Sequence, residues 1–272
     1  MIGIVDLAGG FGNYLFLYAF GLNLKKQGVN VYIYNPTKKY YLEPSEFGFN
    51  KLKGLKFLSL EIYKKLNKKN NNYLLINSEQ IINKKFDVKE LYVDKKVISF
   101  NGFFQDYSFV QENISQIRDT ISQSTNNINS DQNNLIPNTM LHVRRGDYLE
   151  LGEELSINYY KEAISYCKKN IKNFNFNVYT DDYEWTKNQD IFKDANKIEN
   201  TPNIEKRIEN SVLSTFKEML GYENFIIANS TYSWWAAVLG SDDKSVVTCP
   251  SPFYKTHNNN LELNNWVILD RE

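Results

Sequence analysis

Cysteine is scarce in this chain, because Cys167 and Cys249 are the only two among 272 residues. They lie far apart in the sequence and lack the paired spacing of a disulfide framework or of a cysteine-based metal site. This scarcity predicts a reduced protein of the cytosol with no cysteine-bound metal.

Long hydrophobic runs are absent as well. No stretch of about 18 apolar residues occurs, so the sequence predicts no membrane-spanning helix. The start, MIGIVDLAGGFGN, lacks the basic segment and the apolar stretch of a signal peptide. We therefore expect a cytoplasmic protein without a membrane anchor, for which any membrane contact is peripheral and at the inner face.

The chain also has no excess of charge of either sign. Its 32 lysines and arginines balance 32 aspartates and glutamates, which gives a formal net charge of zero. A basic surface for nucleic acid or for an anionic membrane is therefore not expected. The lysine pairs at 64–65 and 68–69 are typical of a solvated helix face, and a patch that contacts a membrane is the alternative.

Aromatic residues, in contrast, are abundant: 19 Tyr, 17 Phe and 4 Trp. This content favours a tyrosine-rich core and rim in an ordinary globular protein. Stacking platforms for a ligand are the alternative, and they require aromatic side chains at specific positions.

The N-terminal segment has the pattern of a strand, a loop, a helix and a second strand. Branched apolar residues at 2–7 predict a buried strand that ends at a glycine-rich loop. Apolar residues recur at helical spacing from Tyr14 to Gln27, and Gly28 suits the helix end. Val29–Tyr34 predicts the next strand. This order is typical of a doubly wound α/β domain.

The remaining chain alternates in the same way around one polar segment. The Asn-rich run at 125–138 lacks periodicity and predicts a linker between domains at 1–130 and 138–272. Further helices are expected at 54–69, 108–124, 158–169, 204–220 and 234–239, and further strands at 97–100, 139–143, 174–180, 225–228 and 245–249. Two α/β domains form a cleft, and ligands of such sheets bind beyond the carboxyl ends of the strands.

The first motif is GGFGN at 9–13, between the first strand and the first helix. Glycines such as Gly10 and Gly12 let the backbone approach an anion, and the helix start around Asn13 offers free amides to a phosphate. It is neither the dinucleotide fingerprint nor a P-loop. A plain tight turn is the alternative.

The second motif is HVRRGDY at 142–148, at the end of a predicted strand. Side chains alternate there, so His142 and Arg144 point one way and Arg145 the other. One arginine can then face the cleft while the other pairs with a carboxylate such as Asp147. A planar guanidinium suits a bidentate grip on phosphate oxygens. An arginine–aspartate clamp under the loop is the alternative.

The third motif, YTDDYEW at 179–185, also ends a predicted strand. A carboxylate of Asp181 or Asp182 can accept hydrogen bonds from the edge of a guanine, or it can cap the following helix. The two aspartates are adjacent rather than separated by one residue, so a divalent metal site is not expected.

The fourth motif is IANSTYSWW at 227–235, where a strand leads into small polar residues that open a helix. Hydroxyls and free amides of Asn229, Ser230, Thr231 and Ser233 favour a diphosphate at the helix start. Ser233 as an ordinary N-cap, with the tryptophans in the core, is the alternative.

Taken together and in order, these four motifs resemble glycosyltransferase family 11, the α-1,2-fucosyltransferases. The matching segments are 9–28, 102–105, 142–148, 179–185 and 225–240, which span most of the chain. Two departures are Tyr14 and Leu17, where the family commonly has glutamine, and we expect them to alter the acceptor side.

The resemblance implies a GT-B type α/β fold, with two Rossmann-like domains facing across a cleft. It implies transfer of L-fucose with inversion from GDP-fucose to the 2-hydroxyl of a galactose-terminated glycan, without a metal or other cofactor. The domain at 1–130, with its glycine-rich loop, would be the acceptor side, and the domain at 138–272 would bind GDP-fucose.

The resemblance also implies the site residues. Arg144 would grip the donor diphosphate and stabilise its departing charge. The other donor-binding residues would be Gly10, Gly12, Asn13, His142, Arg145, Asp181, Asp182, Asn229, Ser230, Thr231 and Ser233.

The residue that takes the acceptor proton is left open. Asp147 lies in the right loop and is our first choice, although pairing with Arg145 is at least as favoured. Asp6, Asp106, Glu150 and Glu153 remain candidates. The rival activities are transfer of fucose or another GDP-sugar to a different glycan or protein hydroxyl, and a non-enzymatic carbohydrate-binding module.

Overall fold

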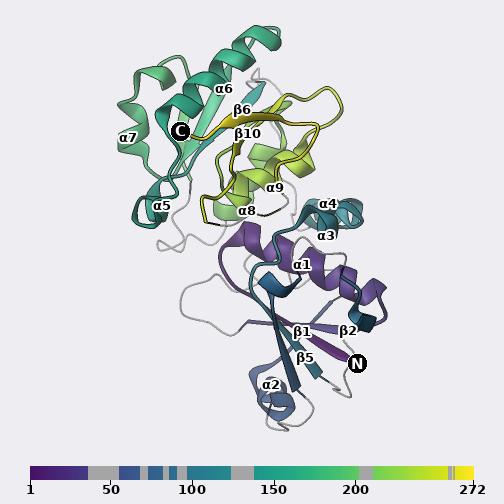
Figure 1. The fold of residues 1–272 in the computed structure, drawn as a ribbon. Coiled ribbons are helices and arrows are strands. Elements are labelled where there is room, and N and C mark those ends of the chain that lie inside the picture. The colour runs from purple at the N-terminus through teal and green to yellow at the C-terminus, as the bar shows by residue number, and fades with distance from the viewer. Residues whose placement is uncertain are drawn as a thin grey trace. The chain divides into compact units, whose positions relative to one another are not determined.

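The structure is a computed structural model, and the residues it describes are 1–35, 55–67, 73–81, 86–90, 97–123, 138–201, 211–256, 259 and 261–272. The chain divides into two compact units, Met1–Ile128 and Asn129–Glu272 (Figure 1). The Asn-rich linker expected at 125–138 lies outside the described residues, except for its last position.

Within the described residues, the N-terminal unit contains a parallel sheet in the order β3-β2-β1-β5-β4. Its strands are β1 (Ile2–Asp6), β2 (Asn30–Tyr34), β3 (Lys56–Phe57), β4 (Tyr73–Asn77) and β5 (Val97–Asn101). Its helices are α1 (Phe11–Lys26), α2 (Leu60–Asn67), α3 (Tyr107–Gln111) and α4 (Ile114–Gln123), with short 3-10 turns at Ser78–Gln80 and Val88–Glu90.

Helices cover both faces of this sheet (Figure 1). On one face α1 packs so closely that a Cβ at Gly21 would lie 2.7 Å from Leu55 Cδ1 and 3.5 Å from Val31 Cγ1. On the other face the ring of Tyr63 from α2 stacks on Tyr34 at 3.7 Å between ring centroids. Because β1 has helices on both sides, its residues from Ile2 to Val5 are apolar on both faces rather than alternating with polar ones.

Within the described residues, the C-terminal unit contains a parallel sheet in the order β11-β10-β9-β6-β7-β8. Its strands are β6 (Thr139–Val143), β7 (Phe176–Thr180), β8 (Lys197–Asn200), β9 (Asn224–Ile226), β10 (Val247–Ser251) and β11 (Val267–Asp270). Its helices are α5 (Gly146–Leu151), α6 (Ile157–Asn170), α7 (Tyr183–Lys187), α8 (Ser211–Leu220) and α9 (Thr231–Gly240), with a 3-10 turn at Asp190–Phe192. Read from β8, the spatial order is third, second, first, fourth, fifth and sixth, which is that of the dinucleotide-binding Rossmann fold.

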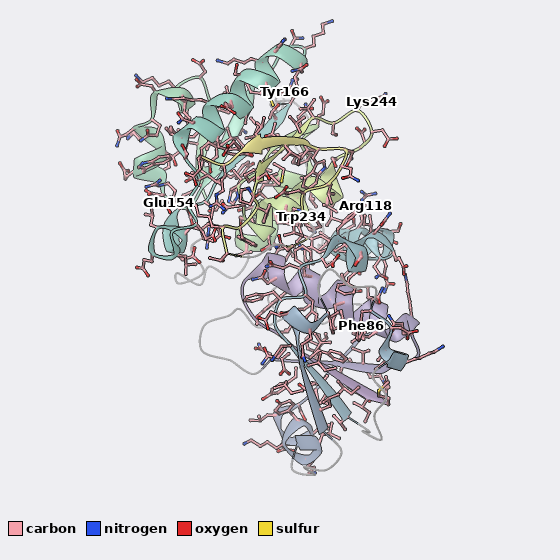
Figure 2. The ribbon with its side chains drawn as sticks, viewed as in Figure 1. Phe86, Arg118, Glu154, Tyr166, Trp234 and Lys244 are labelled. Carbon is pink, nitrogen blue, oxygen red and sulfur yellow. The ribbon has the colours of Figure 1, made fainter. Side chains whose placement is uncertain are left out.

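Aromatic side chains fill the core of the C-terminal unit. Tyr159 and Tyr160 are almost fully buried in one cluster against β6 and β7. Trp234, labelled in Figure 2, and its neighbour Trp235 are fully buried in α9. The indole Nε1 of Trp234 donates to the carbonyl oxygen of Leu261 at 2.8 Å. The alternative that placed these tryptophans in the core is therefore confirmed.

Two helix predictions were wrong in part. The segment expected as a helix from 54 begins instead with β3, and α2 starts only at Leu60. The helix expected at 108–124 is two helices, because the amide of Asn113 bonds back to the carbonyl oxygen of Phe109 and ends the first. The start of the helix expected at 204–220 lies outside the described residues. In the parts of the chain that are described, no helix is both long and apolar enough to span a membrane.

Candidate active site

Three of the four motifs meet at one edge of the C-terminal sheet. They follow β6, β7 and β9, which are parallel neighbours whose carboxyl ends lie at the same edge. The chain runs one way from β6 to β8 and the other way from β9 to β11, so β6 and β9 flank a topological switch point, where ligands of such sheets bind. Several contacts join the motifs. The Tyr148 hydroxyl donates to the Asn229 carbonyl oxygen at 3.1 Å, and the backbone amide of Arg145 donates to Asp181 at 2.8 Å.

Arg144 leads from β6 into this edge and is held by two carboxylates. Its Nη2 lies 2.6 Å from Asp147 Oδ1, and its Nη1 lies 2.9 Å from Asp181 Oδ2. Its Nε is buried and has no hydrogen-bond partner among the described residues. The side chain is 25% exposed and that of Asp147 is 58% exposed, so this half of the arrangement borders solvent.

The expected partner of Asp147 was wrong. Asp147 pairs with Arg144 rather than with Arg145, because the two residues stand three positions apart where the chain turns into α5. Arg145 instead donates from Nε to Asp182 at 3.1 Å, and its guanidinium lies 3.8 Å from the centre of the Trp185 ring. Arg145 thus stabilises the loop that follows β7.

The two adjacent aspartates are both engaged by protein donors. Asp181 binds Arg144 and the amide of Arg145, and its carboxylate lies so close that a Cβ at Gly146 would stand 2.8 Å from it. Asp182 caps α7 by accepting from the Trp185 amide at 3.2 Å. The capping alternative is confirmed for Asp182, while a contact of either carboxylate with guanine stays a prediction.

These side chains carry a net charge of −1, since the two arginines face three carboxylates. His142 adds no charge at neutral pH, because burial and then the nearby Arg144 lower the pKa of His142 to about 3. Its ring lies 6.1 Å from that of Tyr232, and its Nδ1 has no hydrogen-bond partner among the described residues. An anionic ligand at Arg144 would therefore compete with the carboxylates that already bind this side chain.

The fourth motif forms the start of α9. Ser230 is the N-cap, and its hydroxyl accepts from the Tyr232 amide. Ser233, expected as an N-cap or as a ligand donor, is neither: it is fully buried, and its hydroxyl donates to the carbonyl oxygens of Ala228 and Ser230. Asn229 is also fully buried, and Thr231 is 9% exposed. Within this motif, the groups that remain to bind a ligand are chiefly backbone amides.

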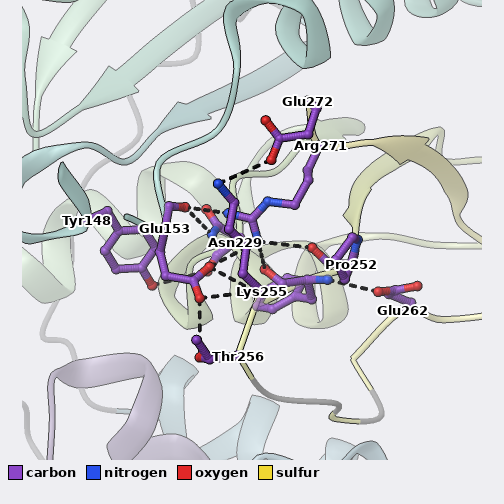
Figure 3. Close-up of polar contacts among 10 residues, drawn as sticks. Tyr148, Glu153, Asn229, Pro252, Lys255, Thr256, Glu262, Arg271 and Glu272 are labelled. Atoms are coloured by element: carbon purple, nitrogen blue, oxygen red, sulfur yellow. Dashed lines mark hydrogen bonds and ion pairs between the residues drawn. The ribbon is translucent and has the colours of Figure 1, made fainter. Parts of the chain in front are cut away.

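A buried ion pair that the motifs do not include supports this edge (Figure 3). Arg271 is 1% exposed, and its Nη1 lies 3.0 Å from Glu153 Oε2. The Glu153 carboxylate also accepts from the backbone amide of Lys255, and the Glu153 carbonyl oxygen accepts from the side-chain Nδ2 of Asn229 at 2.7 Å. Glu153 is thus bound by several donors and is not a free base. Nothing in the sequence pointed to Arg271, because it lies outside the four motifs.

The first motif lies at the corresponding edge of the N-terminal sheet. Gly9 has a φ of 76°, and a Cβ there would collide with the side-chain amide nitrogen of Asn13. Gly10 is the N-cap of α1 and provides no side-chain cap. Gln105, from the loop after β5, donates to Asn13 at 2.8 Å.

The two family departures lie inside α1. Tyr14 is 1% exposed and Leu17 is fully buried. The expected effect of these two departures on the acceptor side stays a prediction. Separately, in the portion of the chain that is described, no group of three His, Cys, Asp or Glu side chains is arranged to hold a metal ion.

Two Rossmann-like units in one chain define an α/β protein of the GT-B type, a fold of glycosyltransferases. Residues 5–270 match the model of glycosyl transferase family 11, and the chain belongs to this family.

The chain resembles several curated and structurally solved proteins. It is 27% identical over 195 residues to the alpha-1,2-colitosyltransferase of Escherichia coli, a match that covers 65% of this chain and 64% of that protein. It is 32% identical over 142 residues to the O-antigen biosynthesis glycosyltransferase WbnK of Escherichia coli. This match covers 48% of this chain and 44% of that protein. The chain therefore matches less than two thirds of the length of either. The crystal structure of the fucosyltransferase NodZ from Bradyrhizobium aligns with a TM-score of 0.50 and 16% identity, over 88% of this chain and 93% of that one, and supports the fold.

Proposed function

We propose that the chain transfers L-fucose from GDP-fucose to the 2-hydroxyl of a galactoside, with inversion and without a metal ion. One observation carries the proposal: the arginine motif after β6 and the start of α9 after β9 flank the switch point of the C-terminal sheet. A guanidinium and the amides of a helix start are both suited to a diphosphate. Family membership and the α-1,2 linkage in the name of one relative support the linkage.

Arg144 is the proposed diphosphate ligand. When the bond between fucose and phosphate breaks, negative charge develops on GDP, and a preorganised cation stabilises it. For this, the diphosphate replaces Asp147. This exchange costs little free energy, because Asp147 is 58% exposed and ion pairs at a surface contribute only about 0–1 kcal/mol to stability. The deeper contact with Asp181 stays in place and orients the guanidinium.

The sequence-based assignment of Asp147 as proton acceptor remains a prediction. Its contact with Arg144 favours a different role, that of an internal competitor for the diphosphate. The variant Asp147→Asn separates the two roles. If Asp147 is the general base, the variant should lose kcat and the acidic limb of the pH–rate profile. If Asp147 competes with the diphosphate for Arg144, the variant should bind GDP more tightly and retain the acidic limb.

A second donor sugar is favoured by one relative, whose name specifies colitose. Fucose and colitose differ by a single hydroxyl group. A site that hydrogen-bonds this hydroxyl discriminates strongly between the two sugars, by about 10⁴- to 10⁵-fold, whereas a site that only packs against it does not. Transfer to a different glycan or to a protein hydroxyl remains the other rival activity.

The test combines binding with transfer. Calorimetry with GDP should detect binding to the wild-type chain, whereas a carbohydrate-binding module would show none. Incubation with GDP-fucose, GDP-colitose, GDP-mannose and UDP-galactose, each with a panel of galactosides, should give transfer from GDP-fucose. Linkage analysis should then find an α-1,2 bond. Transfer from UDP-galactose alone, or binding of galactosides without GDP, would contradict the proposal.

A further inference from the structure

One residue of the arginine motif, Tyr148, contacts groups on both sides of the switch point of the C-terminal sheet. It lies in α5, and the Cζ atom of Arg144 stands over its ring at 5.4 Å from the ring centre. Its hydroxyl donates to the carbonyl oxygen of Asn229 at 3.1 Å, one residue before the N-cap of α9 (Figure 3). A single side chain therefore connects the arginine after β6 with the start of α9.

The hydroxyl of Tyr148 is held from two sides. Tyr254, which follows β10, shares a side-chain hydrogen bond with it. Because the proton of Tyr148 points to Asn229, the hydroxyl of Tyr254 is the donor in this second bond. Burial raises the pKa of Tyr148 to about 12, so the hydroxyl keeps its proton at neutral pH. It is therefore suited to hold a backbone group in place rather than to exchange a proton.

The bond to Asn229 sets the direction of a backbone amide at the start of α9. In a trans peptide the carbonyl oxygen and the following amide hydrogen point in opposite directions. By holding the Asn229 carbonyl oxygen, Tyr148 also fixes the direction in which the amide of Ser230, the N-cap, points. Amides at a helix start are suited to bind a diphosphate.

The ring of Tyr148 restrains the other proposed diphosphate ligand. A guanidinium within about 6 Å of a tyrosine ring centre is attracted to the face of that ring. Arg144 is thus held by two carboxylates and by this ring. When a diphosphate takes the place of Asp147, the ring and Asp181 are the contacts that remain to orient the guanidinium.

We propose that Tyr148 is a positioning residue of the donor site, which holds the Arg144 guanidinium and the amides at the start of α9 so that both bind one diphosphate. This inference rests on the proposed function. The ring acts through Arg144 and the hydroxyl acts through α9, so the two parts of the side chain make separable contributions to the affinity for GDP.

Calorimetry with GDP measures the two contributions. Tyr148→Phe keeps the ring and loses the bonds of the hydroxyl, so the affinity for GDP should fall by about 3- to 10-fold, the usual contribution of a hydrogen bond. Tyr148→Leu also loses the ring and should weaken GDP binding by about a further threefold. Tyr166→Phe and Tyr166→Leu, the same changes at an exposed tyrosine of α6, are the controls and should bind GDP as the wild-type chain does.

The same variants in an Arg144→Ala background distinguish positioning from a general effect on the fold. Without the guanidinium the ring has nothing to orient, so Tyr148→Phe and Tyr148→Leu should bind GDP equally there. A difference of about threefold that persists in this background would overturn the role of the ring.

Binding of GDP by Tyr148→Phe as tight as that of the wild-type chain would overturn the role of the hydroxyl, and this readout remains informative should Tyr148→Leu fold poorly. A failure of the proposed function would appear in the wild-type chain instead. Absence of GDP binding there would overturn both proposals. Binding of GDP without transfer of fucose would overturn the proposed transfer alone, and the variants would still decide whether Tyr148 positions the groups that bind the diphosphate.

Discussion

At the scale of single residues, the surroundings of Arg144 decide what the arginine motif can do. One carboxylate holds it from the interior and a second holds it from the solvent side. These contacts fix the plane of the guanidinium before any ligand arrives. A planar group that is already oriented loses little freedom when it binds a diphosphate.

Replacing Arg144 tests this role. Arg144→Ala should lower kcat by on the order of 100- to 1000-fold, or about 3–4 kcal/mol, because the departing diphosphate loses a preorganised cation. Arg144→Lys should restore little, since an ammonium group cannot make two parallel hydrogen bonds. Steady-state kinetics of folded variants give the answer. Arg118→Ala, on the exposed face of α4, is the control and should behave as wild type.

His142 makes a prediction for stability rather than rate. Because burial lowers its pKa to about 3, the unfolded chain binds a proton between pH 3 and about 6.5 that the folded chain does not. The free energy of unfolding should therefore fall as the pH drops through this window, by up to about 1.4 kcal/mol per pH unit. Asp6, whose pKa is raised by burial to about 6, acts in the opposite sense between pH 3.8 and 6, where the folded chain holds the extra proton.

Urea unfolding of the wild-type chain and of His142→Gln over this pH range isolates the histidine, because Asp6 is common to both. The variant should lose less stability on acidification. If the free energies of unfolding of the wild-type chain and of His142→Gln changed in parallel with pH, His142 would be protonated in the folded chain over this range.

At the scale of elements, the turn from β1 into α1 depends on backbone conformation. Gly9 has a φ of 76°, a region that other residues enter at a cost of about 1–3 kcal/mol. A side chain there would also collide with Asn13 and disturb its hydrogen bond with Gln105. The turn therefore admits glycine for two separate reasons.

Gly9→Ala and Gly28→Ala separate these reasons. Gly28 has a similar φ of 87°, but a Cβ there meets nothing within 4 Å. Both variants should be destabilised in urea by the backbone cost, and Gly9→Ala by more, because it adds the collision with Asn13. Equal losses would mean that Asn13 moves aside freely.

At the scale of the whole molecule, the C-terminal unit is closed by the last residues of the chain. Arg271 binds Glu153 and the carbonyl oxygens of Pro252 and Phe253, and so holds the segment after β10 against the segment after α5 (Figure 3). Glu153 in turn holds Asn229 at the start of α9. A contact at the chain end thus supports the proposed donor edge.

Arg271→Ala should destabilise the chain by about 3–5 kcal/mol, because it leaves the Glu153 carboxylate buried without its cation. Thermal or urea unfolding measures the loss. Lys168→Ala, which removes an exposed pair with Asp194, should cost no more than about 1 kcal/mol. A loss for Arg271→Ala as small as that of the control would contradict the structural role of this pair.

Part of this architecture could be predicted from the sequence because it depends on local patterns. Branched apolar runs gave β1, β2 and β6, and periodic apolar residues gave α1 and α6. The strands β8 and β11 were not predicted, since each has only four residues and none of these residues is fully buried. Their place depends on the neighbouring strand rather than on their own composition.

What the sequence by itself determined is the set of motifs at the strand ends and, through them, the family. What only the tertiary structure decided is the partner of each polar group: Asp147 on Arg144, Ser230 rather than Ser233 at the helix start, and Arg271 on a glutamate 118 positions away. The physical reason is that local pattern reports burial and periodicity, whereas a hydrogen bond or ion pair depends on which strands the fold places side by side.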